Sequence, residues 1–201
     1  MHLQQYCTKV ILIMKNITTI KSFLMAFLLL GLMACDNDDP EPVNEEELIT
    51  TVRVTFTPSG GGSAIVATFQ DLDGEGGNAP VITNPTLAAN TTYSVSVEFL
   101  NESETPTEDI TEEVEEEAEE HQVFFVAASG LNFTYAYNDE DGNGKPLGLM
   151  GTATTGDASN GTLTVLLIHE PNKSASGVSA GDPTNAGGEE DVRVNFSVTI
   201  Q

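Results

Sequence analysis

Cysteine is almost absent from this chain. Only Cys7 and Cys35 are cysteines among its 201 residues, and both lie near the N-terminus. A domain built from the residues after Cys35 therefore has no free thiol, no disulfide and no cysteine-ligated metal site.

Basic residues are scarce as well. The chain has 7 Lys and Arg against 31 Asp and Glu, and every acidic residue follows Cys35. Four basic residues share that part with the 31 acidic ones, so its formal net charge is −27. This balance excludes nucleic acid as a partner, because phosphate contacts need a basic face. The electrostatic field of this negative charge attracts cations, and the charge favours a soluble monomer.

Patterns typical of catalysis give no support for an enzyme. No phosphate-cradling or dinucleotide-binding glycine loop follows a strand and opens a helix. Carboxylate pairs are numerous, but in so acidic a chain they do not indicate an acid–base mechanism. We therefore expect a non-catalytic protein.

The longest apolar run is too short to span a membrane. Residues 23–33 form it, after Lys15 and Lys21 and before Ala34 and Cys35. A spanning helix needs about 20 residues, so this run is the hydrophobic region of a signal. The order of charge, apolar run, small residue and cysteine resembles a bacterial lipoprotein signal. That resemblance implies that residues 1–34 are removed and that Cys35 carries the lipid.

The residues around this signal indicate where the protein is held. Met14 begins a good signal by itself and is an alternative start of the chain. Several acyl chains on Cys35 would anchor the protein stably to a membrane. The acidic run 36–39 resembles the export signal of Bacteroidota-type surface lipoproteins, which implies an outer-membrane, cell-surface location. Residues 35–47 then form an acidic tether.

Residues 48–201 read as a β-rich domain. Strict alternation of apolar and polar residues predicts strands that are buried on one face, as in antiparallel sheets. Asn160-Gly161 predicts a tight hairpin between about 155 and 162. Seven or eight short strands with such turns predict an immunoglobulin-like antiparallel β-sandwich. The alternating segments are 52–57, 93–99, 131–137, 163–167 and 192–200, with weaker candidates at 65–69 and 149–155.

One segment, about 106–121, predicts an amphipathic helix inserted in the sandwich. Thr105 to Glu108 form a capping box with proline at the first helical position. Ile110, Val114, Ala118 and His121 then recur on one helical face. Carboxylates crowd the C-terminal end, which the helix dipole disfavours, so we expect a cationic group to offset them or the last turn to fray.

Two acidic glycine loops share the order Asp-x-Asp-Gly-x-Gly. Carboxylates at alternate positions before a glycine resemble the start of a calcium loop. The bidentate glutamate expected at position twelve is replaced by Ile82 or Met150. The alternative is two β-turns, for which Asp, Asn and Gly are the usual residues. The candidate calcium ligands are Asp71, Asp73, Glu75, Asp139, Asp141 and Asn143.

Histidine offers a second candidate site. His121 and His169 are the histidines that remain after Cys35, and Glu117 lies one helical turn before His121. If the predicted helix meets the end of the strand 163–167, these three side chains could bind zinc or a similar ion with one position open. The alternative is a pair of partly buried, hydrogen-bonded histidines.

A loop of about twenty residues, 170–190, is rich in Gly, Ser, Ala and Asn. Loops of this length in compact domains are usually functional or disordered. Asp182, Asn185 and Glu189 could contact a ligand there. Simple flexibility is the alternative.

Several segments resemble a group of small flavobacterial surface lipoproteins. Members often carry the label type 1 periplasmic binding fold. That fold has two α/β lobes with many crossover helices, whereas the residue pattern here offers one helix. The segments that carry the resemblance are 42–47, 109–117, 121–122, 169–178 and 184–188.

Two hypotheses of function follow. In the first, the protein is a surface ligand-binding module that takes up a divalent metal, zinc or calcium, and passes it to an outer-membrane receptor. In the second, it is a structural or adhesive sandwich without an ion site, displayed for contact with protein or glycan.

Overall fold

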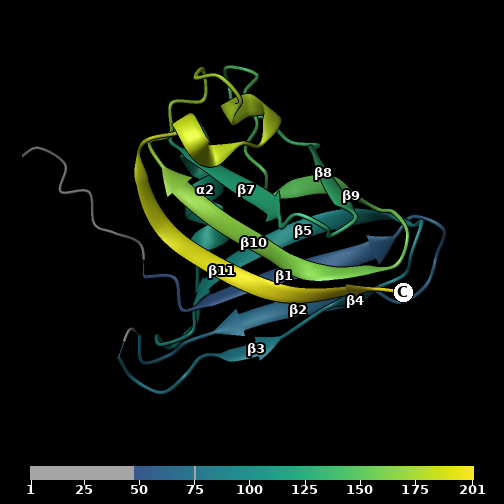
Figure 1. Cartoon of the computed structure of the whole chain (residues 1–201). Helices are drawn as coiled ribbons and strands as arrows, with labels where there is room; N and C mark the ends of the chain where they lie inside the picture. Colours follow the sequence, from purple (N-terminus) through teal and green to yellow (C-terminus); the bar gives the residue numbers. More distant parts are fainter. Residues whose placement is uncertain (1–47, 75) are drawn as a thin grey trace, which may run out of the picture. The chain divides into compact units, whose positions relative to one another are not determined.

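Two β-sheets packed face to face make up the part of the chain that the structure describes. It is a computed structural model that describes residues 48–74 and 76–201 (Figure 1). The predicted signal 1–34, Cys35 and the tether 35–47 lie outside the described residues. The predicted all-β antiparallel sandwich is confirmed.

The larger sheet has seven strands in the order β3-β2-β1-β5-β9-β8, with β6 paired to the far end of β5. All its neighbouring strands are antiparallel. The strands are β1 (Thr51–Pro58), β2 (Ile65–Gln70), β3 (Val81–Thr83), β5 (Thr92–Asn101), β6 (Glu108–Asp109), β8 (Phe133–Tyr137) and β9 (Met150–Thr155).

The smaller sheet has four strands in the order β4-β11-β10-β7. Its long central strands β10 and β11 cross over β1, β2 and β5 in Figure 1. Only β4 runs parallel to its neighbour β11; the other pairs are antiparallel. The strands are β4 (Thr86–Leu87), β7 (His121–Ala127), β10 (Ser159–His169) and β11 (Glu189–Ile200).

Alternation along the strands produces the core, as the sequence predicts. In β5 every second residue from Tyr93 to Phe99 is buried, and those between them are exposed. The buried face packs on the matching face of β10, where Leu163 and Leu167 are fully buried. Each such side chain stabilises the fold by about 1.5–3 kcal/mol through removal of apolar surface from water.

The predicted hairpin at Asn160-Gly161 is wrong. Both residues lie inside β10, and the chain turns earlier, at 156–158, where it passes from one sheet to the other. Gly161 is needed for packing rather than for a turn. A Cβ at this position would lie 2.9 Å from the Cβ of Leu131, so only glycine allows this close approach.

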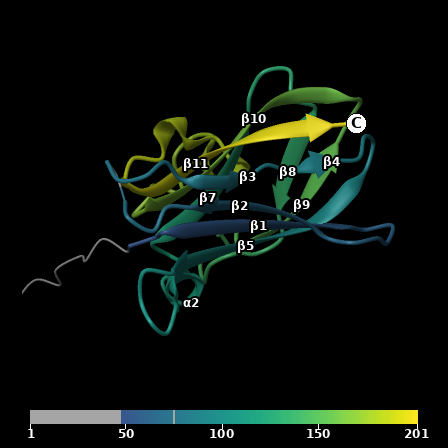
Figure 2. The same ribbon diagram turned by 90° about the horizontal axis from the view of Figure 1, so that it is seen from below.

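The predicted helix is shorter than the pattern suggested. Helix α2 (Ile110–Glu116) is capped by Asp109, whose carboxylate accepts a hydrogen bond from the Thr111 backbone N–H. The residues before it pair with β5 as β6, so the box at Thr105 does not cap the helix. Figure 2 shows α2 beside β5, where the Thr111 hydroxyl bonds the backbone of Phe99.

The helix ends before residue 117, and a turn leads directly into β7. His121 is therefore the first residue of a strand and not the last of a helix, which corrects the prediction. Burial explains the outcome: residues 121–125 are all buried, whereas a helix through this segment would expose part of them.

The segment 170–188 covers part of the outer face of the smaller sheet. Phe124, Leu166 and Ile168 point away from the main core and form a second apolar cluster with Val178 and Ala186. Two short 3₁₀ helices shape the segment, η2 (Val178–Ala180) and η3 (Pro183–Asn185). The predicted loop is therefore anchored by its own small core.

Among the described residues, no helix has both the length and the apolar character required to cross a bilayer.

Candidate functional site

The two histidines that remain after Cys35 stand opposite each other on neighbouring strands. His121 begins β7, His169 ends β10, and the strand register pairs them directly. Their rings stack with centroids 4.7 Å apart and planes inclined by 10°. The exposed fractions are 1% for His121 and 9% for His169. The structure thus brings together the two residues that the sequence left unconnected.

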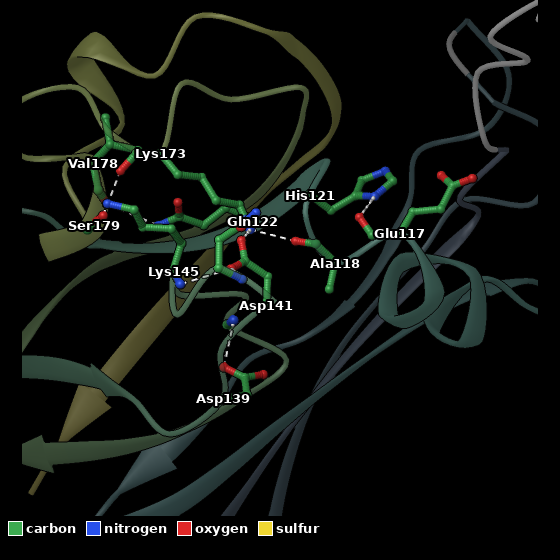
Figure 3. A network of polar contacts seen from close by, with 12 residues as sticks. Glu117, Ala118, His121, Gln122, Asp139, Asp141, Lys145, Lys173, Val178 and Ser179 are labelled. Atoms are coloured by element: carbon green, nitrogen blue, oxygen red, sulfur yellow. Dashed lines mark hydrogen bonds and ion pairs between the residues drawn. The ribbon is translucent and has the colours of Figure 1, made fainter.

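Glu117 reaches the same place from the turn between α2 and β7. Ligand atoms of Glu117, His121 and His169 all lie within 4.8 Å of one another. The Glu117 carbonyl oxygen is also 3.3 Å from Nδ1 of His121 (Figure 3). A metal-bound histidine usually donates its other ring N–H to such an oxygen. With the hydrogen on Nδ1, Nε2 of His121 offers its lone pair to an ion.

Burial keeps the His121 ring receptive to a metal. Loss of solvation lowers the pKa of His121 below its usual range, although the hydrogen bond to the Glu117 backbone opposes the shift. A neutral imidazole binds metal without first losing a proton. The Asp191 carboxylate, itself buried, lies 3.9 Å from Nε2 of His121.

The stacked arrangement sets a condition on metal binding. Zinc–nitrogen bonds are about 2.0–2.1 Å long, and each lies in the plane of its ring. Lone pairs of parallel rings do not converge on one point, so at least one ring must tilt to share an ion. Glu117 is exposed and can follow this movement.

A buried lysine supports the turn that carries Glu117. The Nζ of Lys173 donates to the carbonyl oxygen of Ala118 at 2.5 Å and to Oδ2 of Asp141 at 2.9 Å (Figure 3). Side-chain exposure is 5% for Lys173 and 1% for Asp141. The last turn of α2 has no basic residue, and the helix ends at Glu116, earlier than the pattern predicted.

The second acidic loop uses its carboxylates for protein contacts. Asp139 accepts hydrogen bonds from the backbone N–H groups of Gly148 and Met150. Asp141 accepts from the backbone of Asn143 and Lys145, and it also pairs with Lys173. The Lys173 ammonium therefore occupies the position where calcium would approach Asp141, and the turn interpretation fits this loop.

The first acidic loop has the same character. Asp71 accepts from the backbone N–H of Gly74, and Asp73 accepts from the backbone and side chain of Asn78. The bonds from Asn78 lower the pKa of Asp73 below its usual range. Glu75 lies outside the described residues. Neither loop contributes to the metal-competent groups of the described chain.

Two of the three candidate ligand residues in the segment 170–190 make contacts within that segment. Asp182 caps η3 through hydrogen bonds from the Thr184 backbone and hydroxyl. Asn185 donates to the carbonyl of Ser176, which closes the loop on itself. Glu189 is exposed at the start of β11, opposite His169 in the strand register. Asp182 and Asn185 therefore shape the loop.

Residues 177–181 read Gly-Val-Ser-Ala-Gly, the spacing of a nucleophile elbow, so the chain does contain one pattern typical of catalysis. In the structure, Ser179 lies in the 3₁₀ helix η2, without the strand–turn–helix context of such an elbow. Its hydroxyl donates to the Lys173 carbonyl at 2.6 Å. We read Ser179 as a structural residue that holds the loop around Lys173.

Sequence reasoning missed four residues of this region: Lys173, Asp191, Glu120 and Glu170. Lys173 could have been singled out from the sequence, because basic residues are scarce in so acidic a chain and each is expected to pair with a carboxylate. The other three could not, because no spacing distinguishes them from 28 further Asp and Glu residues. The β7–β10 register brings Glu120 and Glu170 beside the histidines, and Asp191 comes from the neighbouring strand β11.

An open cavity of about 770 Å³ borders this region. Val97, Leu147 and Leu149 form its apolar floor, and the turn 117–120 and the loop 139–142 form its acidic walls. Both Glu117 and Glu120 line the cavity, so solvent and small cations reach the edge of the histidine pair from there.

Searches against protein-family models, curated proteins and solved structures found no match to this chain.

Proposed function

We propose that this protein is a lipid-anchored surface protein whose sandwich domain binds a divalent transition-metal ion, with zinc as the leading candidate. One observation carries the proposal: Glu117, His121 and His169 converge with their ligand atoms within 4.8 Å of one another. Two imidazoles and one carboxylate form a ligand set that suits zinc and related ions.

The composition of the ligand set suits uptake and release. Three protein ligands leave the fourth position of a tetrahedral zinc ion open, whereas structural zinc sites are closed by four. An ion with an open position can be handed to another ligand. The formal charge of −27 after Cys35 concentrates cations near the domain. Delivery to an outer-membrane receptor would use both properties.

Isothermal titration of residues 36–201 with zinc tests the proposal. We expect one ion per chain at micromolar or tighter affinity, and a loss of at least 100-fold in the His121→Asn/His169→Asn variant. The Asp71→Asn/Asp73→Asn variant is the matched control and keeps the affinity. Far-UV circular dichroism confirms that each variant is folded. Undiminished binding by the histidine variant would contradict the proposed site.

The anchor is the second part of the proposal. Cys35 follows an apolar run and a small residue, as a lipidated cysteine requires, and residues 36–39 favour export to the surface. We expect Cys35→Ser to move the protein from the membrane to the soluble fraction. Protease added to intact cells should degrade the wild-type protein. Membrane attachment of the Cys35→Ser variant, or protection from protease, would contradict this part.

A structural or adhesive role is the second candidate, and one surface favours it. Val66 and Val81 are exposed on the same face at the β2–β3 edge of the larger sheet. An edge strand with exposed apolar residues can pair with another chain. A protein or glycan partner that binds equally well with a metal chelator present would support this role over metal uptake.

A further inference from the structure

We propose that Glu120, His169 and Glu170 form an outer metal position, which shares His169 with the inner position and through which the ion enters and leaves. This inference rests on the proposed function and names the route of the ion. Ligand atoms of these three residues also lie within 4.8 Å of one another.

The two positions differ in their access to solvent. In the inner set the His121 side chain is 2% exposed, so an ion from solvent cannot reach it first. In the outer set the Glu120 side chain is 58% exposed, and its Oε2 lies 3.7 Å from Nε2 of His169. A hydrated cation therefore meets the outer carboxylates before it meets the buried ring.

The backbone holds the outer ligands in place. The backbone N–H of Glu170 donates to the carbonyl oxygen of Glu120 at 2.6 Å, which ties the end of β10 to the turn before β7. Glu170 has a positive φ of 51°, uncommon for a residue other than glycine. The backbones of Glu120 and Glu170 thus form one corner of the fold next to His169.

His169 allows the ion to pass between the positions without leaving the protein. The ion first binds Glu120, Glu170 and His169 and gives up part of its water. It then exchanges the two outer carboxylates for His121 and Glu117 while the bond to His169 persists. Only coordination bonds change, and release follows the same steps in reverse.

Stopped-flow kinetics with zinc and a competing zinc-sensitive dye test this route. The test variant is Glu120→Gln/Glu170→Gln in residues 36–201. We expect its association and dissociation rates both to fall about tenfold, with an equilibrium affinity within threefold of wild type. Glu112→Gln/Glu113→Gln is the matched control, because it removes the same charge from exposed residues outside both sets and outside the cavity. Its rates should stay within twofold of wild type.

Three results would overturn the inference, and each has a different meaning. Rates equal to those of the control variant would show that the ion takes another route while the inner site stands. An affinity loss as large as that of the histidine variant would make Glu120 and Glu170 ligands of a single site. No zinc binding by the wild-type protein would remove the proposed function and the outer position together.

Discussion

Replacement of Lys173 by Met is expected to lower the free energy of unfolding by about 3–5 kcal/mol. The Lys173 ammonium and the Asp141 carboxylate are both nearly inaccessible to water and lie 2.9 Å apart. Loss of one partner leaves the other charge buried without compensation, which is the costly way to break such a pair. The Ala118 carbonyl also loses its donor. Urea denaturation followed by circular dichroism measures the change.

Lys145→Met provides the matched control for this measurement. It removes the same charge from the loop that carries Asp141, but the Lys145 contact to Asp141 is made by its backbone N–H and survives the substitution. We expect it to change stability by less than about 1 kcal/mol, as surface substitutions usually do. Equal destabilisation by the two variants would show that the buried pair is not a main support of the turn 117–120.

The same pair predicts how stability depends on acid. Burial alone would raise the pKa of Asp141, but hydrogen bonds from the Lys145 backbone and the Lys173 ammonium outweigh it and lower the pKa below 3.8. A carboxylate whose pKa is lower in the folded than in the unfolded state stabilises the fold at pH values above its unfolded-state pKa. That contribution to the free energy of unfolding is lost as the pH falls through the folded-state pKa. In the Asp141→Asn variant, the free energy of unfolding should therefore fall less steeply with decreasing pH below about pH 4 than in the wild-type protein.

Gly188→Ala is the second substitution with a large expected effect. Gly188 has a φ of 73°, and a Cβ there would lie 2.1 Å from the carbonyl oxygen of His169. The left-handed conformation costs roughly 1–2 kcal/mol in any other residue. The forced shift of the β10 backbone adds about 1–3 kcal/mol. We therefore expect a total loss of about 2–5 kcal/mol, measured by thermal or urea unfolding.

Gly187 separates these two contributions. Its φ is 61°, but a Cβ at this position meets no atom within 4 Å. Gly187→Ala should therefore cost only the conformational part, roughly 1–2 kcal/mol. Gly188→Ala should additionally weaken zinc binding, because the clash displaces His169. If both variants lost the same stability and kept full zinc affinity, the close packing of Gly188 on His169 would be refuted.

The strands could be predicted because each carries its own signal. The alternating residues of β5 and β11 specify one buried face, and no other part of the chain is needed to recognise it. The boundary at α2 could not be predicted, because apolar residues spaced by three and four continue past Glu116. Tertiary packing ended the helix there: His121 pairs with His169 across the sheet.

The candidate metal ligands could be chosen from their chemistry, but the sequence did not show that they lie close together. Glu117, His121 and His169 were chosen because imidazoles are rare in this chain and suit metal ions. Their proximity depends on a strand register that joins residues 48 positions apart. Asp141 shows the opposite case: its sequence context suggested calcium, but the fold paired it with Lys173, a residue far away in the sequence.

The central claim is that His121 and His169 bind one ion together. The most direct measurement is an anomalous difference map from a crystal of residues 36–201 grown with zinc. We predict one strong peak about 2.0–2.1 Å from a ring nitrogen of each histidine, with Glu117 as a third ligand and one ring tilted out of the stack. A peak bound only by carboxylates, or none at the histidines under saturating zinc, would contradict the claim.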